Sequence, residues 1–180
     1  MRGASLLGLA GLMAFAAPVA VLAQSSVPAG DWTTINRDLA ATRYSPLDEI
    51  NRANVARLAP KWSYAMKGFN TAAPLVVDGT MYFPVAHRDV ELAADSGQEK
   101  WVYEEPKTTD QGPGSGGGGG MSGRGLGYWP GDGALGPRLL VVAGKQIIAI
   151  DAATGKLAAG FGEGGRVDID PACGGTPTIH

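Results

Sequence analysis

The chain has 180 residues, of which 44% are hydrophobic and 18% are charged, a composition typical of a globular protein and not of a disordered one. Its formal net charge is -2 and no stretch concentrates Lys and Arg, which argues against nucleic acid as a partner. Glycine (28 residues) and proline (12) are frequent while helical apolar spacing is scarce, so an all-β class is favoured. Because Cys173 is the only cysteine, the chain can form neither an internal disulfide nor a cysteine-based zinc site.

Residues 1–23 have the features of a signal peptide. Arg2 precedes an uncharged run that ends in small residues at Ala23, before a polar stretch. This pattern predicts cleavage after Ala23. The alternative is a retained membrane anchor, because the run is close to the length that spans a bilayer, but Pro18 interrupts it. Export predicts a periplasmic protein, in a Gram-negative source, with no stable membrane span after cleavage.

Residues 24–60 are predicted to form an N-terminal extension with little regular structure, whose aromatic side chains pack against a later surface. A short helix is expected from Asn51, whose side chain can cap free N–H groups, through Leu58, and Pro60 ends it. Over residues 61–66 the apolar period changes to two, which predicts a half-buried strand at the start of the region 61–180.

Two hairpins are predicted further along the chain. In the first, the strands 73–77 and 80–83 are joined by Asp78-Gly79, a dipeptide that tolerates the positive φ of tight turns. In the second, the strands 138–142 and 146–150 flank a turn at 143–145. Between the hairpins, residues 111–120 are dominated by glycine and are predicted to be an inter-strand loop.

The region after each hairpin repeats. Residues 90–101 align with residues 148–159, and both copies run from an apolar strand through a polar turn to a Ser/Thr-Gly pair. The two glycines, Gly97 and Gly155, lie 58 residues apart, a period typical of propellers and solenoids. A third copy begins at residues 175–179. Because radial repetition of four-stranded sheets protects sheet edges, we expect a β-propeller.

The repeat resembles the tryptophan-docking motif Ala-x-Asp-x-x-Thr-Gly-Lys-x-x-Trp of the quinoprotein dehydrogenases, which use pyrroloquinoline quinone (PQQ). Residues 149–156 match its first eight positions, but Ala159 replaces the final Trp; the earlier copy keeps residues 96–97 and Trp101 but has Ala93 where the Asp belongs. In physical terms Asp and Thr can bond turn N–H groups, Gly permits a left-handed bend, and Trp fills the gap between blades. The motif indicates a propeller and not by itself an enzyme.

Three further segments resemble this family, and two of them resemble its branch of glucose dehydrogenases: the opening segment 31–55, the strand opening 122–129 and the stretch 160–168. The resemblance implies an eight-bladed propeller, of which this chain holds the first two blades and the start of a third. It implies a PQQ- and calcium-dependent dehydrogenase that passes electrons to a quinone or a cytochrome. As an N-terminal fragment, the chain alone is expected to be inactive.

The resemblance also implies cofactor contacts. Arg124, with Gly123 beside it, matches an arginine that contacts PQQ, whose three carboxylates suit a two-pronged guanidinium pair. The alternative is a surface arginine in a glycine-rich loop. Members of the family also carry an acidic or amide residue three positions before Pro74, where this chain has Thr71 as a candidate contact.

Substrate class and metal ligands are also expectations from the resemblance. Members that oxidise alcohols have adjacent cysteines near the positions of Gly118-Gly119, so a sugar or polyol substrate is favoured over an alcohol. The calcium ligands and the catalytic base are expected beyond this chain. Acidic residues beside Gly, Pro or polar neighbours are predicted to lie in solvated turns: Glu104, Glu105, Asp132, Glu163, Asp168 and Asp170.

Two rival functions remain open from the sequence. One is a non-catalytic propeller with PQQ-like repeats that acts as an envelope scaffold or interaction protein; the Arg124 motif and the opening segment count against it. The other is a small carbohydrate-binding β domain, against which the incomplete third repeat counts.

Overall fold

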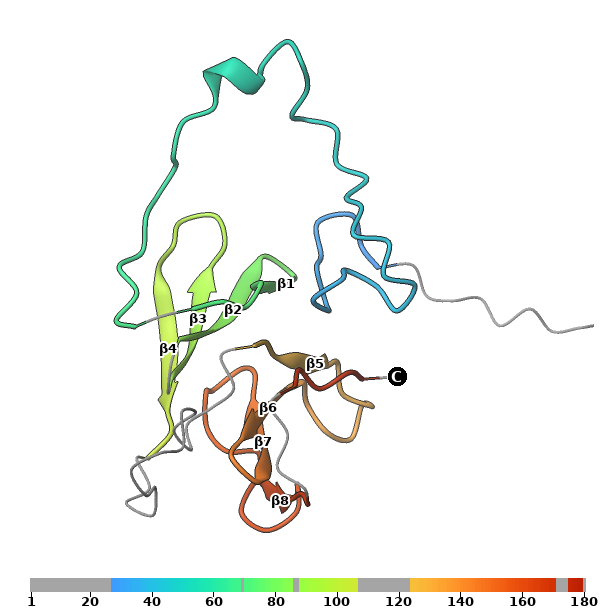
Figure 1. Ribbon diagram of the computed structural model, residues 1–180, viewed down its shortest axis with the longest axis vertical. Coiled ribbons are helices and arrows are strands. Elements are labelled where there is room, and N and C mark those ends of the chain that lie inside the picture. The colour runs from blue at the N-terminus through green and yellow to red at the C-terminus, as the bar shows by residue number, and fades with distance from the viewer. Residues whose placement is uncertain (1–26, 69, 86–87, 107–123, 171–174, 180) are drawn as a thin grey trace, which may run out of the picture.

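The computed structural model describes residues 27–68, 70–85, 88–106, 124–170 and 175–179, with the side chains of 88–90 left aside. These residues form two four-stranded antiparallel sheets of the same up-and-down topology (Figure 1). The first sheet consists of β1 (Leu75–Val77), β2 (Thr80–Val85), β3 (Arg88–Ala93) and β4 (Glu99–Glu104). The second consists of β5 (Gly127–Trp129), β6 (Arg138–Ala143), β7 (Gln146–Asp151) and β8 (Arg166–Asp168). The all-β prediction is confirmed.

The two sheets share the 58-residue period of the sequence. Tyr82 on β2 lies opposite Glu91 on β3, and 58 residues later Leu140 on β6 lies opposite Ala149 on β7. Both predicted hairpins are present, with β2 and β6 each extending beyond its expected end. The first turn contains Asp78-Gly79, and both residues have positive φ (47° and 68°), as this hairpin geometry requires.

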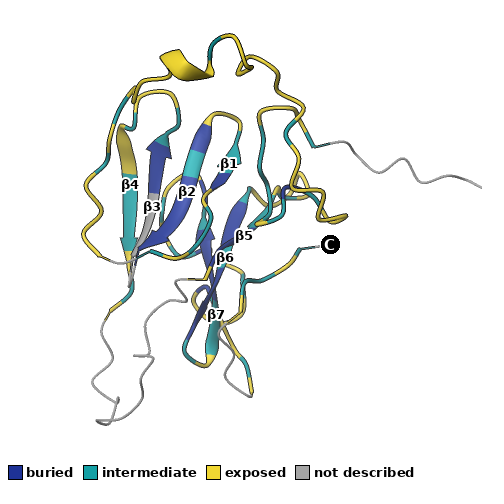
Figure 2. Cartoon of the chain, turned by 45° about the horizontal axis from the view of Figure 1, so that its top comes forward, coloured by how far each residue is buried: buried dark blue, intermediate teal, exposed yellow. Residues whose placement is uncertain are grey.

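The main apolar core lies between the two sheets. Its fully buried members come from both, including Leu75 of the first sheet and Leu139 and Ile150 of the second. The rings of Tyr82 and Tyr128 stack across the interface with centroids 6.2 Å apart. Each such buried aliphatic side chain contributes about 1.5–3 kcal/mol. Figure 2 shows the buried residues in the central strands of both sheets, while the extension around residues 40–60 is exposed.

A tryptophan joins the two sheets at their repeated turns. Trp101 on β4 donates its indole N–H to the carbonyl of Ala152 (3.1 Å) and lies flat against Gly155, which has a φ of 68°. A methyl group on Gly155 would lie 2.5 Å from Cδ2 of that indole, so only glycine allows this approach. The Asp151 carboxylate accepts bonds from the N–H (2.9 Å) and hydroxyl (2.8 Å) of Thr154. The expected roles of the motif's Asp, Gly and Trp are therefore confirmed, whereas the Thr hydroxyl donates to the Asp carboxylate instead of accepting a turn N–H.

Trp62 makes the same contact one repeat earlier. Its indole N–H donates to the carbonyl of Ala94 (3.1 Å), and a methyl group on Gly97 would lie 2.5 Å from Cε3 of the ring. The strand predicted over residues 61–66 is nevertheless wrong, because no ladder within the described chain includes this segment. Its alternation is real in part: Trp62 and Tyr64 are half-buried between exposed neighbours, but Met66 is exposed. What the segment lacks is a neighbouring strand.

The predicted helix at 51–58 is also shorter than expected. Only a single 3₁₀ turn forms, η1 (Val55–Arg57), with no side-chain cap and no buried residue. Asn51 instead closes a turn, because its side chain accepts the N–H of Ala53 (3.0 Å) and its own N–H donates to Asn54. An apolar face with nothing to pack against cannot stabilise a helix of this length.

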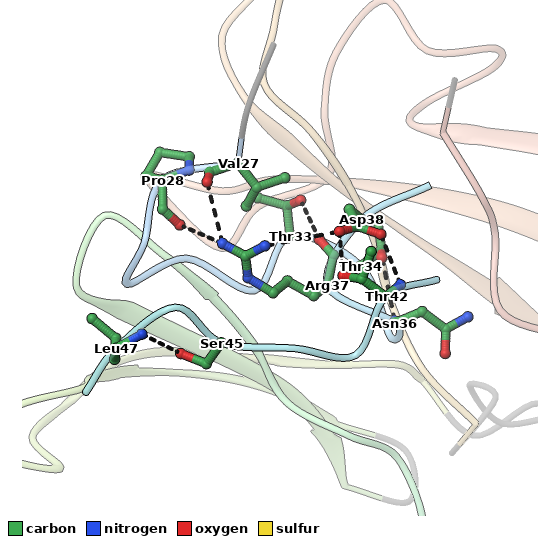
Figure 3. A network of polar contacts seen from close by, with 10 residues as sticks. All are labelled: Val27, Pro28, Thr33, Thr34, Asn36, Arg37, Asp38, Thr42, Ser45 and Leu47. Carbon is green, nitrogen blue, oxygen red and sulfur yellow. Dashed lines mark hydrogen bonds and ion pairs between the residues drawn. The ribbon is translucent and has the colours of Figure 1, made fainter. Parts of the chain in front are cut away.

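The N-terminal extension is tied down at one end. Trp32 exchanges both backbone hydrogen bonds with Val76 (2.7 and 3.0 Å), which attaches the extension to β1. Tyr44 of the extension is 70% exposed, so the prediction that the aromatic side chains of the extension pack against a later surface is wrong for this residue. Nearby, the buried Arg37 adopts a φ of 74° and donates through Nη2 to the carbonyls of Val27 (3.3 Å) and Pro28 (3.4 Å) (Figure 3). Its neighbour Asp38 has a lowered pKa, chiefly because the hydroxyl and N–H of Thr42 donate to its carboxylate.

Some predictions fall outside the described residues: the signal peptide at 1–23, the glycine-rich loop at 111–120, Gly123 and Cys173. Residues 175–179, the start of the third copy, are described and belong to no strand, but they lie against the opening of β5. None of the helices seen in the described ranges is long and apolar enough to cross a bilayer.

Candidate cofactor site

Arg124 lies three residues ahead of β5 and is exposed. β1 and β5 are the first strands of their sheets, and each is called the inner strand below. The next residue, Gly125, has a φ of 151°, and a methyl group there would lie 2.6 Å from the Thr176 hydroxyl oxygen. The backbone next to Arg124 therefore approaches the segment 175–179 closely. A solvent-exposed guanidinium is suited to bind an anionic ligand.

Thr71 lies at a similar place in the first sheet. It is exposed and lies four residues ahead of β1, the inner strand of that sheet. The side chain of Asn70 accepts the N–H of Ala72 (2.6 Å), so Thr71 lies within a closed turn. Leu75 of β1 and Leu126 beside β5 belong to one buried cluster, so Thr71 and Arg124 precede neighbouring inner strands. Gly123, the third predicted contact, is outside the described residues.

Within the described part of the chain, no three or more side chains of His, Cys, Asp or Glu lie close enough together to hold an ion. The acidic residues of the turns are largely exposed, and Asp132 uses its carboxylate to accept the N–H groups of Ala134 (3.0 Å) and Leu135 (2.8 Å), which lowers its pKa. The Asp132 carboxylate therefore closes a turn.

Glu105 is the exception, and its predicted place in a solvated turn is wrong. Its side chain is only 9% exposed and forms a two-pronged pair with Arg166 of β8, with both N–O distances at 2.9 Å. Arg166 also donates to the hydroxyl of Tyr103 (3.0 Å), so a polar cluster bridges the outer parts of the two sheets. Burial raises the pKa of Tyr103, and the Glu105 carboxylate raises that of Arg166. This cluster holds blades together and is distant in sequence from the predicted cofactor contacts.

A second buried carboxylate lies on the face between the sheets. Glu91 is 5% exposed, and Lys100 approaches its Oε1 at 3.3 Å while donating to the hydroxyl of Thr80 (2.8 Å). Oε2 of Glu91 is buried and has no hydrogen-bond partner among the described residues. A register shift between Glu91 and Leu92 allows Lys100 to reach the same face as Trp101. Burial raises the pKa of Glu91, which the pairing with Lys100 only partly offsets.

Sequence reasoning missed both carboxylates for one reason. Glu91 lies in a strand of alternating residues and Glu105 beside a proline, patterns that more often place a charge in solvent. One signal was available for Glu105: Arg166 lies within a segment that resembles the family, so it could have been expected to have a partner. Nothing in the sequence indicates that Lys100 and Glu91 meet, because the register shift is visible only in the sheet.

The fold defines a class. Two four-stranded sheets of identical topology, stacked through a Trp–Gly contact that recurs with the repeat, are neighbouring blades of a β-propeller. Sequence comparison then specifies which propeller. The PQQ family model, described as the β-propeller domain of glucose, ethanol and alcohol dehydrogenases, matches residues 32–178. The chain therefore belongs to the PQQ-dependent dehydrogenase β-propeller family.

Relatives of more than one kind match the chain. Quinohemoprotein alcohol dehydrogenase of Comamonas testosteroni is 38% identical over 129 residues, which cover 70% of this chain and 17% of that protein. Quinoprotein glucose dehydrogenase of Gluconobacter oxydans is 30% identical over 169 residues, covering 80% of this chain and 20% of that protein. The chain thus spans about a fifth of the length of these relatives.

Solved structures agree with the fold. The crystal structure of the Comamonas testosteroni quinohemoprotein alcohol dehydrogenase superposes with a TM-score of 0.64 at 31% identity, covering 84% of this chain and 22% of that one. A europium-containing methanol dehydrogenase superposes with a TM-score of 0.63 at 26% identity, covering 84% of this chain and 26% of that one. The two blades described here thus correspond to about a quarter of the length of each of those chains.

Proposed function

We propose that this chain is the N-terminal part of a periplasmic dehydrogenase that uses PQQ and calcium to oxidise a sugar or polyol and passes electrons to a quinone or cytochrome. One observation carries the proposal: a chain that belongs to this family over residues 32–178 holds the exposed Arg124 at the opening of an inner strand. Arg124 is the residue whose surrounding motif resembles the arginine that contacts the cofactor.

The residues present fit PQQ in their chemistry. Arg124 offers a permanent cation to one of the three carboxylates, and its exposed position leaves it accessible to a ligand. Thr71, exposed ahead of the neighbouring inner strand, offers a hydroxyl, and we include Gly123 because a glycine permits close backbone approach. When bound, the quinone supplies a two-electron oxidant for a CH–OH group. In this proposal Arg124 and Thr71 bind and orient the cofactor and transfer no proton.

The metal and the base belong to other parts of the proposed protein. A cation next to the quinone and a carboxylate that removes the hydroxyl proton are the elements such an oxidation needs. The relatives include a lanthanide-dependent methanol dehydrogenase of Methylacidiphilum fumariolicum, 35% identical over 164 residues. Calcium is our proposal here, and comparing reconstitution with calcium and with europium tests it.

The substrate proposal rests on two glycines. Gly118-Gly119 stand where the alcohol-oxidising members have adjacent cysteines, which supports a sugar or polyol, although relatives named for alcohols and for glucose both match. To test it, the whole protein that contains this chain is loaded with PQQ and calcium, and dye reduction is followed with glucose, a polyol, ethanol and methanol. Faster turnover of ethanol or methanol than of every sugar and polyol would overturn the substrate proposal.

Cofactor binding by Arg124 has its own test. Arg124→Ala should weaken PQQ binding about 10–100-fold, because a charge-assisted two-pronged pair contributes about 1.5–3 kcal/mol. Arg124→Lys should recover only part of that affinity, since an ammonium cannot form the paired geometry. Arg57→Ala, at an exposed arginine of η1, is the matched control. Fluorescence titration with PQQ measures the affinity, and equal affinity in Arg124→Ala and Arg57→Ala would remove Arg124 from the site.

A further inference from the structure

Four aromatic side chains form a row through the interface between the two sheets. Tyr128 of β5 stacks on Tyr82 of β2 with ring centroids 6.2 Å apart, and the Tyr82 ring lies 6.1 Å from that of Trp101 on β4. Tyr103 follows Trp101 by two residues, so both side chains leave the same face of β4, about 7 Å apart along the strand. All four belong to one core cluster. The row therefore runs from the inner strand of the second sheet to the last strand of the first.

Every side chain in this row can be oxidised by one electron. Phenol and indole rings lose an electron far more readily than a phenyl ring does, and electrons cross gaps of this size between such rings in successive steps. The other face of the first sheet differs, because Tyr64 there packs against Phe83, with ring centroids 5.9 Å apart. A phenyl ring does not relay electrons in this way, so that contact does not extend a row of oxidisable rings.

The β4 end of the row has a base for the proton that oxidation releases. The Tyr103 hydroxyl donates to Oε2 of Glu105 at 2.6 Å, and the Glu105 side chain is only 9% exposed. A tyrosine that loses an electron also loses its phenol proton, and a carboxylate within hydrogen-bond reach can receive it directly. Arg166 pairs with this carboxylate and donates to the same hydroxyl oxygen, which fixes the orientation of the pair. Tyr103 is thus placed to couple electron loss to proton transfer.

We propose that this row carries oxidising equivalents from β5 to Tyr103 and so protects the interior of the protein. A one-electron oxidant at the β5 end, such as a peroxide-derived radical, gains one electron, which moves along the row from Tyr103. Tyr103 loses that electron and transfers its O–H proton to Glu105, which leaves a neutral tyrosyl radical beside a carboxylic acid. Because Tyr103 is half-buried, a small one-electron reductant in solvent can return the electron, and the proton then returns from Glu105. The proposal does not depend on PQQ or on the substrate.

A photo-oxidant attached at the β5 end tests the proposal. Thr178 is exposed and lines a small pocket together with Tyr128, so Thr178→Cys in a Cys173→Ser background attaches a ruthenium tris-bipyridine complex at this end. Illumination with a cobalt(III) ammine as electron acceptor produces ruthenium(III). A spin trap followed by peptide mapping locates the protein radical. We expect the trapped adduct at Tyr103 of the labelled chains and not in unlabelled chains mixed with them.

Three variants separate electron transfer along the row from packing. Tyr82→Phe keeps the ring in the core but interrupts the row, so the adduct at Tyr103 should be lost. Glu105→Gln keeps the size of the side chain but removes the base, and the same adduct should decrease. Tyr64→Phe is the matched control, because Tyr64 also donates to a carboxylate, that of Glu99, but lies outside the row. It should leave the adduct unchanged.

Three outcomes would overturn the proposal. An undiminished Tyr103 adduct in Tyr82→Phe would show that the row does not carry the electron, and an undiminished adduct in Glu105→Gln would show that Glu105 does not receive the proton. Equal adducts in labelled and unlabelled chains would show that the oxidant acts through solvent. If Tyr82→Phe disturbs the fold, Trp101→Phe interrupts the row at the next ring and should lose the adduct in the same way.

Discussion

The two sheets have the same topology and period but are not held together by the same residues. On the face between them the first sheet presents Thr80, Glu91 and Lys100, while the positions 58 residues later hold Arg138, Ala149 and Ala158. The first copy of the repeat keeps the tryptophan and lacks the Asp, and the second keeps the Asp and lacks the tryptophan.

The structure explains why each copy can be incomplete. Trp101 of the first copy lies on the Asp151–Gly155 turn of the second, so the motif functions across two blades and not within one. The tryptophan of a copy packs on the blade that follows, and the turn of the same copy receives the tryptophan of the blade that precedes. The comparison therefore predicts unequal effects for equivalent substitutions in the two sheets.

Removing the tryptophans should have the largest effect. Trp101→Ala is expected to lower the free energy of unfolding by about 3–5 kcal/mol, because it leaves a cavity between two ordered sheets and removes an indole hydrogen bond. Trp62→Ala should cost roughly half as much, since an apolar groove lined by Trp62, Met81 and Phe83 is already open to solvent. Urea denaturation of both variants measures the difference. Equal losses would contradict the view that Trp101 packs in a closed interface and Trp62 in an open one.

Two glycines with the same φ allow the cost of backbone strain to be measured apart from the cost of disturbing the Trp101 contact. Gly79 and Gly155 both have a φ of 68°, but a methyl group meets nothing within 4 Å at Gly79 and lies 2.5 Å from the Trp101 ring at Gly155. Ala at either position should cost about 1–2 kcal/mol for the left-handed backbone. Gly155→Ala should cost about 1–3 kcal/mol more from overpacking. Equal losses in thermal or urea unfolding would show that the indole does not lie against Gly155.

Glu91 and Lys100 of the first sheet can both be replaced by alanine, the residue that the second sheet has at both equivalent positions. Lys100→Ala alone should destabilise by about 2 kcal/mol, less than for a fully buried pair because 44% of the Lys100 side chain is exposed. The double variant Glu91→Ala with Lys100→Ala takes the second sheet's residues and should be closer to the parent than the single variant is. A double variant less stable than Lys100→Ala would show that Glu91 contributes beyond its pairing with Lys100.

Glu91 also predicts a pH dependence that the second sheet lacks at the same place. Burial raises its pKa above the ordinary value of 4.5, so its contribution to stability is fully present below that value and is lost as the pH rises through the raised pKa. Glu91→Gln should therefore gain stability relative to the parent as the pH rises from 4.5. Urea unfolding across this range measures the gain, with Glu163→Gln, at an exposed turn residue, as the control. Parallel profiles for the parent and Glu91→Gln would contradict it.

The smallest effect should come from restoring the missing Asp. The backbone turn at Ala93 matches that at Asp151, because in both copies the carbonyl accepts the N–H groups three and four residues later. Ala93→Asp would add a carboxylate that accepts from Ser96, as Asp151 accepts from Thr154, and should stabilise by about 0.5–1 kcal/mol. A shift in the thermal midpoint measures it, and no gain would mean that Ser96 cannot replace Thr154.

The fold could be predicted from the sequence because its signals are local. Asp78-Gly79 and the apolar runs on either side specify a hairpin without reference to the rest of the chain, and the 58-residue repeat then predicts a second one. The segment 61–66 was predicted as a strand on the same local grounds. It differs because a strand also needs a neighbour, and alternation does not show where that neighbour is.

The candidate site was less accessible to sequence reasoning. Arg124 was singled out through its motif, and the structure adds that the neighbouring Gly125 approaches Thr176 too closely for any larger residue. Glu91 and Glu105 were not expected to be buried, because their partners Lys100 and Arg166 come together only through a register shift and through the packing of two sheets. Such pairings depend on distances between segments that no local pattern encodes.

The docking of Trp101 on Gly155 bears on how such proteins can change in evolution. The unit that is duplicated, one sheet with its turn, is offset from the unit that packs, a tryptophan from one copy and a turn from the next. Loss of a whole copy would bring Trp62 to the turn of the following one, where the same carbonyl and glycine are present. Repeats of this kind can therefore be gained or lost as complete units without leaving an indole that has nowhere to bind.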